Sequence, residues 1–390
     1  MKNIYFDYAA TTPIDPVVLK EMSFYLTKEF GNAGSLHFFG QKAMRALDLS
    51  REKIAKLIGA DFKEIIFTSG ATEANNLALR GVFFKFKKLN PEIKPKIIIS
   101  SIEHESVLET ARNLENYGAK VIYLKVNQYG LIDLKQFKKE LDKNTILVSI
   151  MYANNEIGTI EPIKKISQII INFKKEYNLN YPFFHTDASQ AFQFLDCNVL
   201  NLGIDLMTLS SHKIYGPKGI GVLYIKKEIQ NYIDPQITGG GQEFNLRSGT
   251  ENIAAIAGFS KAIELSFNLR QQEFKRIYDL RNYFWEKIKL ILKDIKLNQN
   301  PNFKNTLPNI LNIYFPGKNS SELITKFDLA GIAISSGSAC NARSSESSRV
   351  LLSCGYNKDR AMQSLRFSFG KFTKKQDIDK ALSFIKIMKL

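Results

Sequence analysis

The sequence predicts an α/β protein with a large domain built on a mostly parallel sheet and a smaller C-terminal α+β domain. Between about residues 64 and 227, short runs of β-branched and apolar residues alternate with longer amphipathic stretches. Such alternation is typical of strands and helices that follow one another along the chain, with the strands parallel and helices on both faces of the sheet. The length of 390 residues favours two or three domains.

The elements of the large domain follow in order from the N-terminus. Residues 16–58 are expected to be helical, and further helices are expected over residues 71–86 and 163–177, where apolar residues recur at helical spacing. In the second helix of the first stretch, one face carries Ala43, Leu47, Ile54 and Leu57. Seven strands are predicted, at EIIFTSG (64–70), KIIIS (96–100), KVIYLKV (120–126), TILVSIM (145–151), PFFHTDA (182–188), DLMTLSS (205–211) and GVLYIKK (221–227).

The C-terminal region combines long helices with a few strands. We expect residues 264–390 to form the smaller domain and residues 1–263 to hold the N-terminal segment and the large domain. The Gly-rich residues 238–250 are expected to be a connector without regular structure. Strands of the smaller domain are predicted at ILNIYF (310–315), IAISS (332–336) and SLRFSF (364–369).

The chain is strongly basic, because 54 Lys and Arg residues against 38 Asp and Glu residues leave a net charge of +16. A basic surface can bind nucleic acid or another acidic partner. Here the lysines are spread along predicted helices, as in residues 163–178. We therefore expect a generally solvated surface, with nucleic-acid binding as the alternative.

Cysteine content and hydropathy indicate a reducing, aqueous compartment. Cys197, Cys340 and Cys354 are too few and too irregularly spaced for a disulfide framework or a zinc site. No run approaches the 18 to 20 apolar residues of a membrane span, and the N-terminus lacks a signal-peptide pattern. A cytoplasmic protein with at least one free thiol and no membrane contact is expected.

Chemically active side chains come directly after five of the predicted strands, where ligands bind in open α/β sheets. They are the small-residue turn at 69–72, His104, Asn155, Asp187 with Gln190, and Lys213. Each has an ordinary interpretation when taken alone. The turn could be a capped helix start, His104 a hydrogen-bonded structural histidine and Asp187 a cap or turn residue.

Together these side chains match the requirements of pyridoxal 5'-phosphate. That cofactor needs a cradle for its phosphate, an aromatic ring to stack on, a carboxylate for its ring nitrogen and a lysine for covalent attachment. The turn at 69–72, His104, Asp187 and Lys213 could supply these four groups. Once a substrate amine displaces the lysine from the cofactor, the freed lysine amino group can move protons at the substrate α-carbon.

The motifs resemble, in order and approximate spacing, those of the cysteine desulfurases of the iron–sulfur-cluster type. These are class V, aspartate-aminotransferase-like pyridoxal phosphate enzymes of fold type I. The resemblance extends over nearly the whole chain. It rests on FDYAATTPIDP (6–16), TSGATEANNLA (68–78), SIEH (101–104), MYANNEIGTIEPI (151–163), HTDASQ (185–190), SSHKIYGPKGIG (210–221), GGGQ (239–242), RSGTEN (247–252), SSGSAC (335–340) and SLRFSFGKF (364–372).

The resemblance implies a role for each matching residue. Lys213 would carry the cofactor as a Schiff base and Asp187 would pair with its ring nitrogen. His104 would stack on its ring and carry protons. Arg366, with Asn155, would bind the substrate carboxylate, which suits the planar guanidinium. Other cofactor contacts would come from Ala71, Thr72, Asn155, Gln190, Ser210 and His212, and from Thr250 to the phosphate of the other subunit in a homodimer.

Cys340 matches the nucleophile of the family and lies in SSGSACNARSS, a run of small polar residues. Residues 333–348 are expected to form a mobile loop, because the thiol must reach the substrate and then an acceptor. The resemblance implies sulfur removal from L-cysteine, which gives L-alanine and a persulfide on Cys340. An iron–sulfur scaffold protein or another acceptor would take the sulfur, with Cys340 as a transient cluster ligand and tRNA thiolation as a further destination.

Two other enzymes on the same fold are alternatives, a selenocysteine lyase and an aminotransferase. Plain transamination needs no loop nucleophile, so replacing Cys340 with serine distinguishes it from desulfuration. A third hypothesis is a basic nucleic-acid-binding protein without catalysis, which predicts salt-sensitive binding and a colourless preparation.

Overall fold

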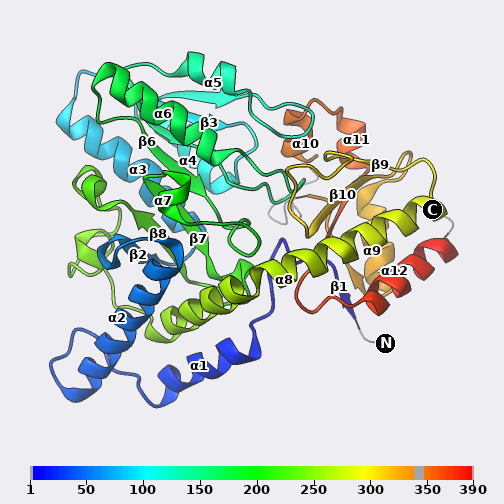
Figure 1. The fold of residues 1–390 in the computed structure, drawn as a ribbon, viewed down its shortest axis with the longest axis horizontal. Coiled ribbons are helices and arrows are strands. Elements are labelled where there is room, and N and C mark those ends of the chain that lie inside the picture. The colour runs from blue at the N-terminus through cyan, green and yellow to red at the C-terminus, as the bar shows by residue number, and fades with distance from the viewer. Residues whose placement is uncertain (1–2, 338–346, 389–390) are drawn as a thin grey trace.

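A seven-stranded sheet forms the centre of the larger part of the molecule (Figure 1). The computed structural model describes residues 3–337 and 347–388. Strand β8 runs antiparallel to both of its neighbours and the other strand pairs are parallel, which confirms the predicted mostly parallel sheet. In spatial order the strands are β2 (Ile65–Thr68), β8 (Gly221–Ile225), β7 (Leu206–Ser210), β6 (Phe183–Asp187), β5 (Thr145–Ser149), β3 (Lys96–Ser100) and β4 (Lys120–Leu124).

Helices cover both faces of this sheet. Alternate residues of a strand point to opposite faces, so each strand can pack against helices on both sides. Ile97 and Ile99 of β3 pack in one apolar cluster with α3 (Ala71–Leu89) and α4 (Glu105–Glu115). Ile98 packs in another cluster with α2 (Phe38–Ile58), α6 (Ile163–Tyr177) and α8 (Ile253–Ile291). Smaller elements on the large sheet are η1 (Phe62–Glu64), α5 (Leu134–Glu140), α7 (Val199–Leu202), η2 (Ser211–Lys213) and η3 (Lys227–Tyr232).

The predicted helical stretch at residues 16–58 consists of two helices. Helix α1 (Pro16–Thr27) is separated from α2 by a glycine-containing turn. A Cβ at Gly31 would lie 2.2 Å from the carbonyl oxygen of Phe39, so the backbone approaches too closely here for any larger residue. The predicted face of α2 is confirmed in that Ala43, Leu47 and Ile54 are buried.

A second, antiparallel sheet of three strands lies at the other end of the molecule, in the order β12, β10, β9. The predicted strand at 332–336 instead pairs with an N-terminal strand, β1, in a separate two-stranded sheet. Strands β1 and β9 have two residues each, too few for a hydropathy pattern to show. These elements are β1 (Ile4–Tyr5), β9 (Lys296–Leu297), β10 (Ile310–Tyr314), α9 (Ser320–Leu329), β11 (Ile332–Ala333), α10 (Arg349–Ser353), α11 (Lys358–Met362), β12 (Ser364–Ser368) and α12 (Lys375–Met388).

Helix α8 runs from the large sheet to the small one (Figure 1). Its first half packs with α1 and α2, and its second half packs with α12 and β10. The predicted boundary between residues 263 and 264 falls inside this helix. The division into 1–263 and 264–390 therefore stays a prediction.

The Gly-rich residues 238–250 contain one short 3-10 turn, η4 (Glu243–Asn245), where no regular structure was expected. Glu243, Phe244 and Asn245 all have positive φ, at 49°, 57° and 64°. This left-handed conformation is unfavourable for side chains other than glycine, and asparagine tolerates it best. The Glu243 carboxylate holds the turn in place through two bonds of 2.7 Å from the buried Arg51 guanidinium.

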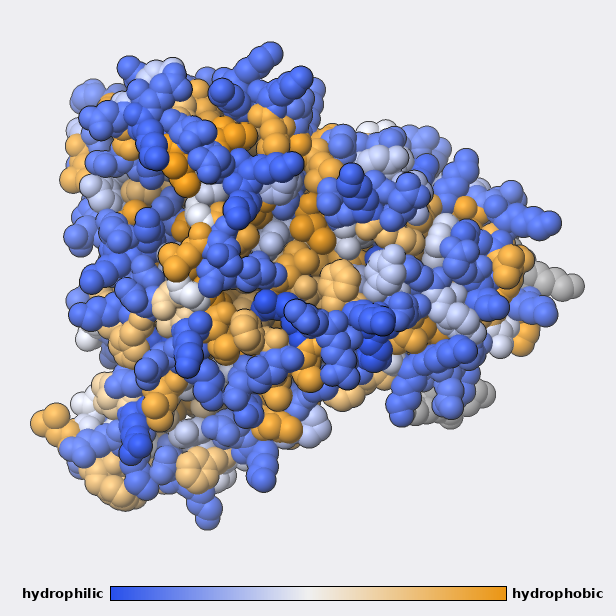
Figure 2. All heavy atoms as spheres, in the orientation of Figure 1, coloured by the Kyte–Doolittle hydropathy of each residue, from blue (hydrophilic) through white to orange (hydrophobic). Residues whose placement is uncertain are grey.

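Hydrophilic side chains cover most of the face seen in Figure 2. This agrees with the expected solvated surface. Among the described residues, no helix combines the length and the apolar character needed to cross a membrane.

Candidate active site at the carboxyl edge of the large sheet

A cavity of about 590 Å³ opens where the parallel strands of the large sheet end. It collects side chains that are up to about 360 positions apart in the chain, because parallel strands deliver their following loops to one edge. The predicted residues that line it are Ala71, Thr72, His104, Asn155, Asp187, Gln190, Ser210, His212, Lys213 and Arg366.

The start of α3 forms a cradle suited to an anion. Gly70 caps the helix with a φ of 151° and has open space around the position of a Cβ, so the backbone lies open to the cavity. The first turn of a helix has N–H groups without intrahelical partners and a positive dipole end. Glu73 braces this turn by accepting from Ser69 N at 2.7 Å and from Arg247 Nε at 2.8 Å.

Two further residues of the cradle come from the end of β7. Ser210 is the last residue of the strand, and His212 lies in η2 with its Nδ1 3.1 Å from the Thr11 hydroxyl. Burial, helped by the positive charges of Lys213 and Lys218, lowers the pKa of His212 to about 4. The ring is therefore neutral at pH 7 and can serve as a hydrogen-bonding group.

Lys213 follows directly in η2, at the floor of the cavity. Its Nζ donates to the carbonyl oxygens of Ala9 and Ala10, at 2.8 and 2.6 Å. The Gln190 amide also donates to the Ala9 carbonyl, at 2.9 Å. The N-terminal segment thus forms one wall of the site, a contribution that the strand-end argument did not predict.

Asp187 ends β6 and is nearly buried. Its Oδ1 accepts from Ser189 N at 2.9 Å and its Oδ2 accepts from Asn75 Nδ2 at 2.8 Å. Sequence reasoning missed Asn75, which lies on α3 beside the buried Ala74 and Leu77. A polar side chain on the apolar face of a helix was the signal that could have identified it.

His104 caps α4, and its Nδ1 accepts from Ser106 N at 3.1 Å. Burial lowers its pKa, with Asp187 opposing the shift and Lys213 adding to it. The imidazole is therefore neutral at pH 7. The His104 ring is among the groups that line the cavity.

Arg366 enters the site from the middle of β12, an outer strand of the three-stranded sheet, and is 1% exposed. Its Nη2 bonds Asp7 Oδ1 at 2.7 Å, and its Nη1 donates to the Asn155 carbonyl at 2.8 Å. Its Nε has no partner among the described residues. A buried guanidinium beside a cavity, with a donor to spare, suits a carboxylate ligand. Asp7 was not predicted from the sequence.

Among the described residues, Thr250 is the predicted site residue that does not line this cavity. Thr250 is exposed and lines a neighbouring cavity of about 180 Å³, together with Ser69 and Arg247. Cys340, predicted as nucleophile and transient cluster ligand, lies outside the described residues. Cys197 and Cys354 are buried, and burial raises the pKa of both thiols to about 12.

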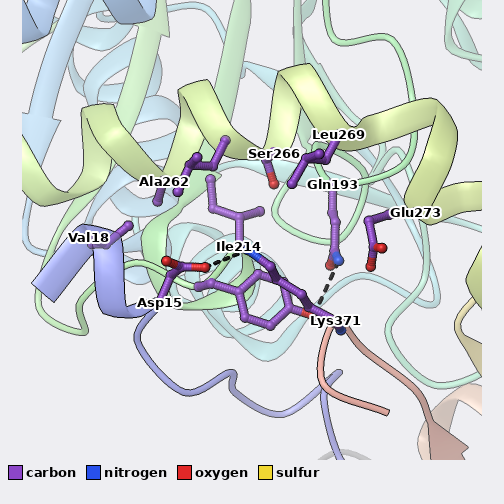
Figure 3. A pocket seen from close by; sticks show the side chains of 11 residues that line it. Asp15, Val18, Gln193, Ile214, Ala262, Ser266, Leu269, Glu273 and Lys371 are labelled. Atoms are coloured by element: carbon purple, nitrogen blue, oxygen red, sulfur yellow. Dashed lines mark hydrogen bonds and ion pairs between the residues drawn. The ribbon is translucent and has the colours of Figure 1, made fainter. Parts of the chain in front are cut away.

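Another cavity lies between α1, α8 and Lys371 (Figure 3). Asp15 and Lys371 form an ion pair of 2.5 Å in its wall, and Val18, Ile214 and Ala262 supply apolar surface. Its volume of about 20 Å³ has room for a single water. This cavity is too small for a cofactor, whereas the cavity at the strand ends has room for one.

Comparison with known proteins gives full-length matches. The model of the family "Aminotransferase class-V" matches residues 4–381. The "Cysteine desulfurase IscS" of Dictyoglomus turgidum is 44% identical over 384 residues, which cover 98% of this chain and 94% of that protein. A solved "NifS-like protein" aligns with a TM-score of 0.90 at 34% identity over 99% of both chains. The structure "SspA in complex with cysteine" aligns with a TM-score of 0.78 at 36% identity, covering 94% of this chain and 98% of that one.

The fold and the site define a pyridoxal-phosphate enzyme of fold type I. The residues fit this cofactor, since an anion cradle, a carboxylate and a lysine converge on one cavity. Within that class, the chain belongs to the class V aminotransferase family, in its cysteine desulfurase branch.

Proposed function

We propose that this protein removes sulfur from L-cysteine and releases L-alanine, leaving a persulfide on Cys340. The observation that carries the proposal is the convergence of Asp187, Lys213 and Arg366 on a single cavity. A carboxylate for a ring nitrogen, an amine for covalent attachment and a guanidinium for a substrate carboxylate are the groups that pyridoxal-phosphate chemistry on an amino acid requires.

The chain's own residues would hold the cofactor as follows. Lys213 attaches it through Nζ, Asp187 bonds its ring nitrogen and His104 packs against its ring. When bound, pyridoxal phosphate supplies an electron sink for the substrate α-carbon. The phosphate and the ring hydroxyl are held by Ala71, Thr72, Ser210, His212 and Gln190.

Arg366 and Asn155 would bind and orient the substrate. The Asp7 carboxylate fixes the Arg366 guanidinium at 2.7 Å, so the remaining donor edge is presented to a ligand without further ordering. The Asn155 carbonyl accepts from the same guanidinium, which keeps the two residues in contact across the site. This pair selects an α-carboxylate and sets the direction of the substrate side chain.

Cys340 would perform the sulfur transfer. Its thiolate attacks the sulfur of the bound cysteine and a sulfur–sulfur bond forms. The carbon–sulfur bond breaks with its electron pair on the substrate carbon, and protonation of that carbon gives alanine. The persulfide then passes to an iron–sulfur scaffold protein or another acceptor, with Cys340 as a transient cluster ligand and tRNA thiolation as an indirect use.

We further propose a homodimer in the cytoplasm. Thr250 is exposed and lies outside the cavity of its own chain, which supports a role at the phosphate of the second copy. Exposed apolar side chains between α1 and α2, such as Phe30, Leu36 and Phe38, offer surface for an interface. Thiols in a chain without a disulfide framework favour a reducing compartment.

The test is to incubate the purified protein with L-cysteine, to quantify alanine and to find by mass which residue gains sulfur. We expect one alanine for each sulfur and the added mass on Cys340. The variant Cys340→Ser should lose sulfur release, whereas Cys354→Ser, as a matched control, should keep it. Persulfide on Cys354 or Cys197, or undiminished release by Cys340→Ser, would overturn the mechanism. Conversion of cysteine to its 2-oxo acid would instead indicate an aminotransferase.

A further inference from the structure

Beneath the candidate site, a continuous row of hydrogen bonds connects Asp187 to His104. The Asn75 amide nitrogen donates to Asp187 Oδ2 and to Ser106 Oγ, both at 2.8 Å. Ser106 Oγ lies 2.9 Å from His104 Nδ1. Asn75 has no exposed surface and Ser106 is nearly buried, so water does not compete for these bonds. The side chain expected at the cofactor ring nitrogen and the one expected to stack on the ring are therefore connected through two residues that have no assigned role.

The negative charge of Asp187 sets the direction of every bond in this row. A carboxylate only accepts, so the Asn75 amide must turn its NH₂ group toward it. The second N–H of the same group then points at Ser106 Oγ. Because that oxygen accepts from Asn75, its own hydrogen is directed at the remaining neighbour, His104 Nδ1.

A second donor reaches the same nitrogen independently. The backbone N–H of Ser106 also points to His104 Nδ1, at 3.1 Å, as the side-chain cap of α4. A backbone amide can only donate. Nδ1 therefore receives two hydrogens, and the proton of the neutral imidazole must lie on Nε2.

We propose that Asn75 and Ser106 are positioning residues that hold His104 as the neutral tautomer with its proton on Nε2, in a direction set by the Asp187 carboxylate. In this tautomer the other ring nitrogen of His104, Nε2, carries a hydrogen that it can donate. Protonation of Nδ1 would turn an acceptor into a donor facing two other donors. This inference rests on the proposed cofactor site and assigns two further residues to it.

The charges around His104 are consistent with the neutral tautomer. Asp187 and Glu105 favour the imidazolium, whereas Lys213 and Arg349 oppose it. Burial outweighs them and lowers the pKa of His104, in agreement with a neutral ring. The hydrogen bonds then decide which nitrogen carries the proton.

The primary test is ¹⁵N NMR of the cofactor-free protein with labelled histidine. The chain has four histidines, and the His104 signals are assigned by their loss in His104→Gln. We expect His104 to show an unprotonated Nδ1 and a protonated Nε2 at pH 7. A protonated Nδ1 would overturn the proposal. Because neither cofactor nor cysteine is present, the result is independent of the proposed desulfurase activity.

A double-mutant cycle tests the route through Asn75. In Asn75→Leu, which keeps the branched shape of the side chain and removes its hydrogen-bonding groups, the freed Ser106 hydroxyl can accept from a protonated Nδ1. The pKa of His104 should therefore rise by about one pH unit, the worth of one hydrogen bond to a charged group. Ser106→Ala should also raise it, since the bond to the neutral ring is lost. In the double variant Asn75→Leu should add nothing further.

Two comparisons complete the cycle. Asn76→Ala changes the next residue of α3, whose amide donates to the Thr72 carbonyl, and should leave the His104 signals unchanged. If Asn75→Leu shifts the pKa of His104 equally in the presence and in the absence of the Ser106 hydroxyl, the connection through Ser106 is refuted. It is also refuted if Asn75→Leu causes no shift. If Asn75→Leu does not fold, the wild-type tautomer and Ser106→Ala still decide the question, because an unaltered pKa in Ser106→Ala contradicts the proposal.

Discussion

At the residue scale, burial decides which side chains of this protein carry charge. Glu161 is an example outside the candidate site. Desolvation raises the pKa of its carboxyl to about 8, although Oε1 accepts a hydrogen bond from Ile132 N at 3.1 Å. Its Oε2 has no partner among the described residues. A protonated carboxyl is therefore the stable form in the folded chain near neutral pH.

This shift predicts a pH-dependent loss of stability that Glu161→Gln removes. The folded-state pKa lies above the unfolded value of 4.5. The stability that the protonated Glu161 carboxyl contributes is therefore fully present below pH 4.5 and is lost as pH rises toward 8. The loss is on the order of 3 to 5 kcal/mol in all. Glutamine can accept the Ile132 bond without a charge, so the variant should melt at a higher temperature than the wild type at pH 8.

The measurement is the thermal midpoint of both proteins at pH 5 and pH 8. Their difference should widen with pH, and a constant difference would contradict the assignment. The exposed Glu109→Gln should show no such trend.

The same scale shows which site residues the sequence can predict. Asp187 and Lys213 were found because each directly follows a buried apolar strand, and the carboxyl ends of strands mark ligand sites. Arg366 came only from the resemblance, since it lies inside a strand of the small sheet. Asp7 was missed because its contact with Arg366, 359 positions away, leaves no local pattern. Asn75 leaves a local signal as a polar residue on the apolar face of α3, but that signal does not identify its distant partner Asp187.

At the element scale, the buried ion pair between Arg51 of α2 and Glu243 of η4 connects a helix to a strained turn. The Glu243 carboxylate also accepts from Phe67 N in β2, at 2.9 Å. The Arg51 guanidinium packs against the rings of Phe62, Phe67 and Phe244. Three elements thus depend on one pair of charges, and the turn precedes the segment that carries Thr250.

Removal of one partner should cost more than removal of both. Arg51→Met leaves the Glu243 charge buried without its partner, which typically costs about 3 to 5 kcal/mol. In Arg51→Met with Glu243→Gln no charge remains, so much of the loss should be recovered. Urea denaturation of the wild type and both variants measures this. Equal losses in the single and double variants would show that packing of the arginine, and not its charge, holds the turn.

Elements with a clear hydropathy pattern were predicted, and those defined by such long-range contacts were not. Six strands of the large sheet are fully buried and the edge strand β4 is partly exposed, and each lies in an apolar-rich run that the sequence shows directly. The turn η4 has no such pattern. Its left-handed residues are held by contacts of the Glu243 carboxylate with Arg51, almost 200 positions earlier, and with Phe67 N.

At the scale of the whole molecule, the site exists only where distant segments meet. Asp7 from the N-terminal segment, Asn155 from the large sheet and Arg366 from the small sheet form one hydrogen-bonded group. Helix α8 fixes the separation of the two sheets by packing on both. In a homodimer the site would also include a residue of the second copy, because Thr250 does not line the cavity of its own chain.

Mixed dimers test this last step. Thr250→Ala should weaken pyridoxal phosphate binding about 10-fold, the worth of one hydrogen bond to a charged group, whereas Lys213→Ala should abolish covalent attachment. When the two variants are combined in one dimer, the chain with Lys213 receives an intact Thr250 from its partner. Half of the sites should then bind the cofactor with wild-type affinity, as absorbance titration would show. In the reciprocal dimer, with both changes on one chain and a wild-type partner, the site that keeps Lys213 receives alanine and should stay weak. Strong binding in the reciprocal dimer would mean that Thr250 serves its own chain.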